Sequence, residues 1–119
     1  MSSNIRHATV TWTHGLVFEG GAPGGPAIRM DGDDALGPSP VVLLLLSAAS
    51  CSGADVVLIL EKMRAKLSAF RVEVTGTRRT EDPKRLTALH LTYHLAGTDL
   101  DEAKARRAID LSIGKYCSV

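Results

Sequence analysis

The longest run of hydrophobic residues lies near the middle of the chain, within residues 37–64, and predicts one long helix. Ser39 is in position to cap this helix, and Pro40 takes the first helical position, where its missing N–H costs nothing. Between Val41 and Leu60 there is one acidic residue and no basic one, so every face of the helix is apolar. Such a helix is either buried on all sides or spans a membrane.

An acidic residue near the middle of the helix favours the buried interpretation. About twenty apolar residues are enough to cross a bilayer, but Asp55 in mid-span would cost about 2.5–3.5 kcal/mol on insertion. No aromatic residue flanks either end. We therefore predict a core helix and no membrane span. Because a chain of 119 residues has few other elements to cover this helix, we expect a second copy to do so, in a homodimer with the helix at or near the interface.

Alternating apolar and polar positions predict five strands, three before the helix and two after it. In the first strand, Ala8, Val10 and Trp12 lie on one side. A charged connection that contains Pro83 joins the last two strands. The predicted strands are residues 5–13, 16–19, 27–31, 70–77 and 86–95.

A second, amphipathic helix is predicted after the last strand. Thr98 and Asp99 are expected to cap it. Gly114 is expected to end it, and Lys115–Val119 to begin another strand. Its apolar stripe recurs at helical spacing and consists of Ala105, Ala108, Ile109, Ser112 and Ile113. This order of elements predicts an antiparallel α+β fold in a single domain, residues 1–119.

Charge and composition exclude several classes of function. The net charge is +1, which removes the electrostatic case for binding nucleic acid or anionic lipid. The glycine-rich loop at residues 20–26 lacks the Lys-Ser/Thr ending of a phosphate-binding loop. The four histidines do not have the spacing of metal ligands. We expect no metal and no bound cofactor, and two cysteines without an export signal predict a cytoplasmic protein.

The two cysteines are the candidate reactive groups. Cys51 lies in the middle of the long helix and Cys117 follows the second helix, so they form neither a C-x-x-C motif nor a zinc half-site. Two interpretations remain open: both are small buried hydrophobic residues, or they react. On a continuous helix Cys51 is about 18 Å from Ser39, beyond the reach of the helix dipole. A cation brought close by the fold would then have to stabilise its thiolate.

Two segments together resemble the osmotically inducible protein C (OsmC/Ohr) family. They are GPSPVVLLLLSAASCSGADVVLILEKMR, with its helical cysteine, and GTDLDEAKARRAIDLSIGKYCSV, with the late Lys-Tyr-Cys-Ser-Val motif. The strands ATVTWTHGLVFEGG and IRMDG fit the family's N-terminal meander, so the resemblance covers nearly the whole chain. It implies an intertwined α+β homodimer, with a long central helix and two sites at its interface, that reduces organic hydroperoxides.

The resemblance also implies a role for each cysteine. Cys51 would attack the hydroperoxide and become a sulfenic acid, and Cys117 would condense with it to a disulfide. An external dithiol, in the best-known branch a lipoylated protein, would reduce that disulfide. An apolar channel beside the helix would favour alkyl or fatty-acid hydroperoxides over hydrogen peroxide.

At three places the chain differs from the peroxidase branches of the family. A glutamate early in their central helix is replaced here by Val41-Val42. The turn that carries their activating arginine contains His14, so the candidate cations are His14, Arg29 and Arg6. The family also usually continues after Cys-Ser-Val with a further strand. The chain thus resembles the less characterised "redox protein" branch, and two functions remain: a thiol peroxidase, or a non-enzymatic dimer that binds a hydrophobic or thiol-bearing small molecule.

Overall fold

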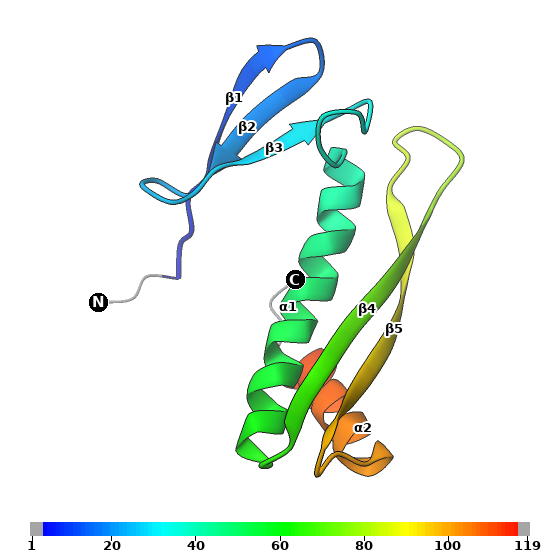
Figure 1. Cartoon of the computed structure of the whole chain (residues 1–119). Coiled ribbons are helices and arrows are strands. Elements are labelled where there is room, and N and C mark those ends of the chain that lie inside the picture. Colours follow the sequence, from blue (N-terminus) through cyan, green and yellow to red (C-terminus); the bar gives the residue numbers. More distant parts are fainter. Residues whose placement is uncertain (1–3, 117–119) are drawn as a thin grey trace. The chain divides into compact units, whose positions relative to one another are not determined.

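The computed structural model describes residues 4–116, without the side chain of Tyr116, and Cys117 therefore lies outside the described residues. Three strands precede a long helix, which is followed by two strands and a second helix (Figure 1). Both sheets are antiparallel, which confirms the predicted α+β class. The chain divides into two compact units, Met1–Leu44 and Leu45–Val119, with the boundary inside the long helix. The single domain stays a prediction.

The N-terminal unit contains the predicted meander of three strands. They pair in the order β1-β2-β3, and their bounds are β1 Thr9–His14, β2 Val17–Gly21 and β3 Ile28–Asp31. The first strand begins at Thr9, later than predicted, because Thr9 already pairs with Gly21, the last residue of β2. Gly15, in the turn after β1, has a φ of 52°, a left-handed conformation that suits glycine.

One face of this sheet is apolar and exposed. Trp12 pairs with Phe18, so the two share a face, and Gly20 pairs with both Val10 and Ile28 on the same side. The exposed fractions are 63% for Trp12, 58% for Val10, 50% for Ile28 and 37% for Phe18. A face of this composition is unusual for a surface that remains in water.

The long helix, α1 Pro40–Lys62, is continuous as predicted. The Val42 N–H donates to Ser39 Oγ at 3.3 Å, which confirms the predicted cap. Within one chain the helix is only partly covered. Its buried residues are Ala48, Ala49, Ser52, Gly53, Val56 and Leu60. Its large exposed hydrophobic residues are Val42, Leu44, Leu46, Val57 and Leu58.

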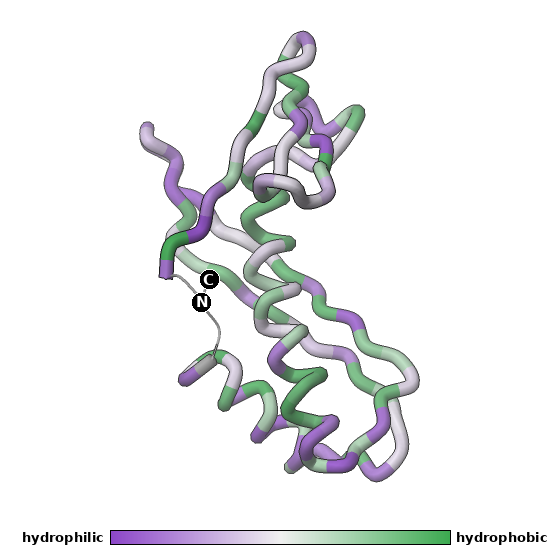
Figure 2. Tube along the Cα trace, turned by 90° about the vertical axis from the view of Figure 1, so that its left-hand side faces the viewer, coloured by the Kyte–Doolittle hydropathy of each residue, from purple (hydrophilic) through white to green (hydrophobic). Residues whose placement is uncertain are grey.

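Hydrophobic residues follow α1 along most of its length (Figure 2). Among the helices that the structure describes, α1 is the one that meets the length and composition expected of a membrane span. Core helices of soluble proteins meet the same criterion. The prediction that α1 is a core helix therefore depends on what covers its exposed face.

The C-terminal unit packs two long strands and a short helix against α1. The strands, β4 Lys66–Arg78 and β5 Leu86–Thr98, form a two-stranded sheet. They are longer than predicted because backbone pairing extends to Lys66 and Thr98, beyond the alternating apolar positions. The buried core cluster of this unit consists of Val56, Leu60, Ala65 and Ala108.

The last helix, α2 Glu102–Leu111, begins later than predicted. Asp101 caps it by accepting a hydrogen bond from the Lys104 N–H at 2.8 Å. The predicted cap at Thr98-Asp99 is wrong, because Thr98 still pairs in the sheet and Asp99 has a φ of 56°, outside the extended region that a cap adopts.

The predicted end of this helix at Gly114 is also wrong. A π-helical turn, η1 Ser112–Tyr116, continues past Gly114. Lys115 and Tyr116 lie in this turn, so they do not begin a strand as predicted. The rest of the predicted strand, residues 117–119, lies outside the described residues. The positive-φ glycines of the described residues are Gly15 and Gly24. Gly114 therefore does not adopt the left-handed conformation in which glycine commonly ends a helix.

We expect Asp31→Asn to weaken the N-terminal unit in a pH-dependent way. The buried carboxylate accepts the backbone N–H groups of Asp33 and Leu36, at 2.9 and 3.0 Å, and these bonds hold the pKa of Asp31 below its ordinary value. Because the pKa of Asp31 is lower in the folded protein than in the unfolded chain, the ionised carboxylate stabilises the fold above about pH 4. This stabilisation is lost as the pH falls through the pKa of the folded state. In urea unfolding the variant should be less stable than wild type at pH 7, and the difference should shrink below about pH 4. Loss of the same size in the exposed Asp33→Asn variant would contradict this.

We expect Leu60→Ala to reduce the free energy of unfolding by about 2–5 kcal/mol. Leu60 is fully buried in the core cluster of the C-terminal unit, so alanine would leave a cavity. The matched control is Leu58→Ala on the same helix, where the side chain is 57% exposed and the loss should be less than half as large. Urea unfolding monitored by circular dichroism measures both, and equal losses would contradict the position of the core.

Candidate active site

Cys51 is half-buried near the middle of α1. Residues at positions i, i+4, i+7 and i+11 of a helix share one face. Cys51 therefore lies on the same face as Asp55, Leu58 and Lys62. These last three residues line a pocket of about 250 Å³, which begins one helical turn beyond the thiol.

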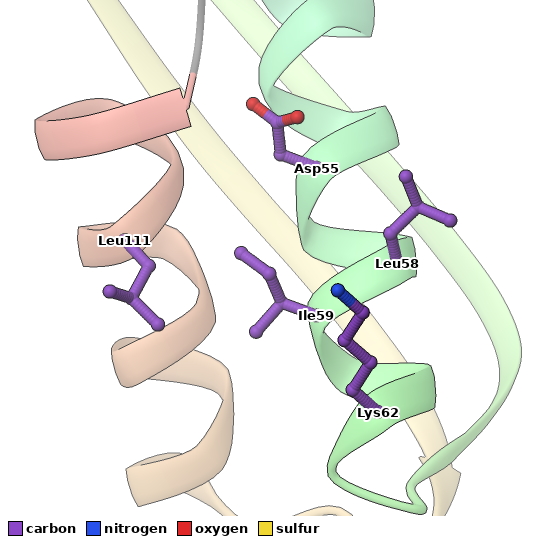
Figure 3. A pocket seen from close by; sticks show the side chains of 5 residues that line it. All are labelled: Asp55, Leu58, Ile59, Lys62 and Leu111. Atoms are coloured by element: carbon purple, nitrogen blue, oxygen red, sulfur yellow. The ribbon is translucent and has the colours of Figure 1, made fainter.

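The pocket lies between α1 and α2 and is mainly apolar. Its remaining walls are Ile59 of α1 and Leu111 of α2, and Figure 3 shows these two side chains facing each other between the helices. Asp55 contributes a carboxylate at the end nearer Cys51, and Lys62 contributes an ammonium group further along. A small molecule with an apolar body would fit a site of this composition.

A buried hydrogen-bond network lies directly beside Cys51. Ser52 and Ser112 are both fully buried. The Ser112 hydroxyl is 3.1 Å from Ser52 Oγ, 3.3 Å from the Ser52 carbonyl oxygen and 3.1 Å from Asp55 Oδ2. Ser52 Oγ is also 2.5 Å from the Tyr93 hydroxyl of β5. The network thus joins α1, β5 and the turn that follows α2.

The network has a consequence for the second cysteine. Ser52 follows Cys51 in the chain, and Ser112 comes five residues before Cys117. From Ser112 as far as Tyr116 the chain forms the π-helical turn η1. Because Cys117 is outside the described residues, the approach of the two thiols stays a prediction.

The predicted activating cations all lie in the N-terminal unit. Arg29 forms an ion pair with Glu19 at 3.1 Å. His14 ends β1, and one guanidinium N–H of Arg6 donates to the Ile5 carbonyl oxygen at 3.3 Å. Cys51 belongs to the C-terminal unit, so its pairing with any of the three also stays a prediction.

The sequence analysis did not identify the hydroxyl network. The available signal was Ser112 within an otherwise apolar stripe, together with Ser52 in an apolar helix, since a buried serine needs a hydrogen-bond partner. Which partner it takes depends on packing between segments sixty positions apart. By contrast, the first turn of α1 contains no acidic residue, as Val41-Val42 indicated.

Comparison with known proteins identifies the family. The family model described as OsmC-like protein matches residues 31–119. Protein YhfA of Escherichia coli strain K12 is 42% identical over 113 residues, which cover 94% of this chain and 84% of that protein. Among solved structures, a hypothetical protein from Aquifex aeolicus VF5 is 29% identical with a TM-score of 0.85, covering 98% of this chain and 84% of its own. The organic hydroperoxide resistance protein OhrB of Bacillus subtilis shares the fold at 17% identity and a TM-score of 0.60, with 94% and 86% covered. The chain therefore belongs to the OsmC/Ohr family, as its two cysteine-containing segments predicted.

Proposed function

We propose that the protein is a cytoplasmic thiol peroxidase that reduces organic hydroperoxides, with Cys51 as the peroxidatic and Cys117 as the resolving thiol. One observation carries the proposal: Ser112, close before Cys117, is hydrogen-bonded to Ser52, the neighbour of Cys51. These hydrogen bonds join the turn after α2 to the middle of α1, next to Cys51. Family membership supports the proposal, because the OsmC/Ohr family includes peroxidases.

The proposed reaction has two steps on the protein. In the first, the Cys51 thiolate attacks the hydroperoxide, the O–O bond breaks, the alcohol leaves with a proton, and Cys51 becomes a sulfenic acid. In the second, the Cys117 thiol attacks the sulfenic sulfur, a disulfide forms and water leaves. An external dithiol, such as that of a lipoylated protein, then reduces the disulfide.

The surroundings of Cys51 support an alkyl substrate. The thiol is half-buried, and the adjoining pocket wall is formed by Leu58, Ile59 and Leu111. Transfer of an alkyl group from water to such an apolar wall is favourable, whereas hydrogen peroxide has no alkyl group to transfer. The thiolate also needs a cation, for which His14, Arg29 and Arg6 remain the candidates.

We further propose that two copies pair through their exposed apolar faces. On α1, Leu46 and Val57 are 47% and 41% exposed. They line a groove of about 330 Å³ that also includes Phe70 and Val72 of β4. The apolar face of the N-terminal sheet, which carries Trp12, is a second surface of this kind. Each of these surfaces suits an obligate interface, which resembles the core of a domain.

A second function is favoured by the start of α1. The first turn has no acidic residue, whereas the resemblance to the peroxidase branches would place a glutamate early in this helix. Without it, the pocket beside Cys51 could serve a non-enzymatic dimer that binds a hydrophobic or thiol-bearing small molecule. In that case the molecule would occupy the same apolar walls without a redox step.

We expect wild-type protein to consume cumene hydroperoxide with dihydrolipoamide as reductant, and Cys51→Ser to lose this activity by at least about a hundredfold, because only a thiolate attacks the O–O bond. After one equivalent of peroxide without reductant, mass spectrometry should find a Cys51–Cys117 disulfide in wild type. The Cys117→Ser variant should instead accumulate the Cys51 sulfenic acid.

The control is Ser50→Ala, which removes a hydroxyl next to Cys51 but leaves both thiols. If wild-type protein consumes peroxide no faster than the Cys51→Ser variant and forms no disulfide, the peroxidase function is excluded. Saturable binding of an alkyl ligand to the same protein would then favour the non-enzymatic function.

We expect wild-type protein to sediment as a dimer and Leu46→Lys as a monomer at the same micromolar concentration. A charge placed in an apolar interface loses its hydration without gaining a partner. Each 1.4 kcal/mol of binding free energy lost in this way raises the dissociation constant of the dimer tenfold. Thr75→Lys, a substitution at an exposed position of β4, is the matched control and should remain dimeric. A monomeric wild type would exclude the proposed pairing.

A further inference from the structure

We propose that the pocket between α1 and α2 binds an apolar molecule with a single anionic head group, and that Lys62 holds this head group. The pocket has a volume of about 250 Å³, and its lining carries one charge of each sign, on Asp55 and on Lys62. The inference goes beyond the proposed function, because a ligand can occupy the pocket whether or not Cys51 is redox-active. It names the chemical class of the ligand and the residue that selects it.

The middle of the pocket provides an apolar wall for the body of the ligand. Leu58 and Ile59 of α1 and Leu111 of α2 form this wall, and Figure 3 shows Ile59 and Leu111 facing each other. A cavity of roughly 150 Å³ with leucine and isoleucine walls is large enough to hold benzene. The larger pocket found here therefore has room for an alkyl segment. Leu58 is 57% exposed, and contact with an alkyl chain would remove part of this area from water.

The two charged residues of the pocket have different surroundings. Asp55 is half-buried, and its Oδ2 accepts a hydrogen bond from Ser112, which is fully buried. Lys62 is exposed, and its ammonium group forms no ion pair or hydrogen bond with another described residue. The carboxylate thus belongs to the inner end of the pocket and the ammonium group to its open side.

This difference in burial determines which head group can bind. A charged head group that enters an apolar site loses hydration and needs a partner of opposite charge. At the open side an anionic head group keeps part of its hydration and gains the ammonium group of Lys62, while Asp55 repels it from the inner end. A cationic head group is repelled by Lys62 at the open side and would be desolvated beside Asp55. The pocket therefore selects an anionic head group with its chain directed inward.

The number of charges in the lining favours a monoanion. Among the described residues that line the pocket, Lys62 is the only one with a positive charge. Its ammonium group acts as a point charge, which can neutralise one negative charge but does not offer the bidentate contact of an arginine. A second negative charge on the head group would remain without a partner and would be repelled by Asp55. A monocarboxylate fits this lining better than a dianionic phosphate ester.

The proposed orientation also says which end of the ligand approaches the thiol. Asp55 precedes Lys62 by seven residues, a rise of about 10.5 Å along the helix. Cys51 lies on the same face, one turn beyond Asp55. The apolar end of the ligand, and not its head group, is therefore directed toward Cys51.

The experiment measures binding to the reduced full-length chain, without peroxide, by calorimetry and by NMR of the methyl groups. We expect decanoate to bind and to shift the methyl resonances of Leu58, Ile59 and Leu111. Decanol and decyl phosphate should bind about fivefold more weakly, because a partly exposed ion pair contributes up to that factor, and decylamine more weakly still. The advantage of decanoate over decanol should shrink at high salt, since screening weakens an exposed charge pair.

Two lysine variants provide the matched comparison. Lys62→Met removes the charge and keeps an apolar stem, so its affinity for decanoate should fall about fivefold, to the level of decanol, while its affinity for decanol is unchanged. Lys66→Met is the control, because Lys66 is also exposed and belongs to the same unit but does not line the pocket. This variant should bind decanoate as wild type does. Circular dichroism checks that both variants are folded.

The outcomes separate this proposal from the peroxidase. Equal affinities of wild type for decanoate and decanol, or equal losses in Lys62→Met and Lys66→Met, would overturn the role of Lys62. Methyl shifts confined to Leu46, Val57 and Val72 would place the ligand in the groove of α1 and β4 and overturn the site. Absence of decanoate binding would overturn the ligand class. Intact decanoate binding in a protein that consumes no peroxide would exclude the peroxidase alone and leave the site in place.

Discussion

The hydrogen bonds between Ser52 and Ser112 are the interaction on which the candidate site depends. They join the middle of α1 to the end of α2, and both side chains are fully buried, so neither can exchange its partner for water. Tyr93 extends the same network to β5. Apolar contacts supply most of the free energy of packing, but they do not fix how one helix is positioned along another. The polar network fixes this position, and it includes Ser52, the residue that follows the candidate nucleophile Cys51.

The apolar character of α1 is the second constraint. One face packs on the core of the C-terminal unit, while the side chains of Leu44, Leu46 and Leu58 are about half exposed. The strands of one chain cannot cover a helix that is apolar on all sides, because they bury only the face against which they pack. The proposed pairing of two copies and the proposed site are therefore physically related, since the helix that needs a partner also carries the reactive thiol.

Local signals in the sequence were accurate where a residue's own chemistry decides its structure. Ser39 and Pro40 place the start of α1 correctly, because a cap and a fixed φ act within one turn. The start of α2 could not be predicted in the same way. Thr98 is an acceptable cap, but it pairs with Lys66 across the sheet, so Asp101 caps the helix instead. Likewise, Gly114 would end an isolated helix, yet the chain continues in a π-helical turn anchored at Ser112.

The sequence by itself determined the α+β class, the continuous central helix, the position of Cys51 within it and membership of the OsmC/Ohr family. These follow from hydrophobic periodicity and from short motifs, which are properties of neighbouring residues. Only the tertiary structure decided that Ser112 bonds to Ser52 and Asp55, that a pocket lies between α1 and α2, and which face of α1 a single chain leaves exposed. Each of these depends on the distance between segments far apart along the chain, and periodicity carries no information about that distance.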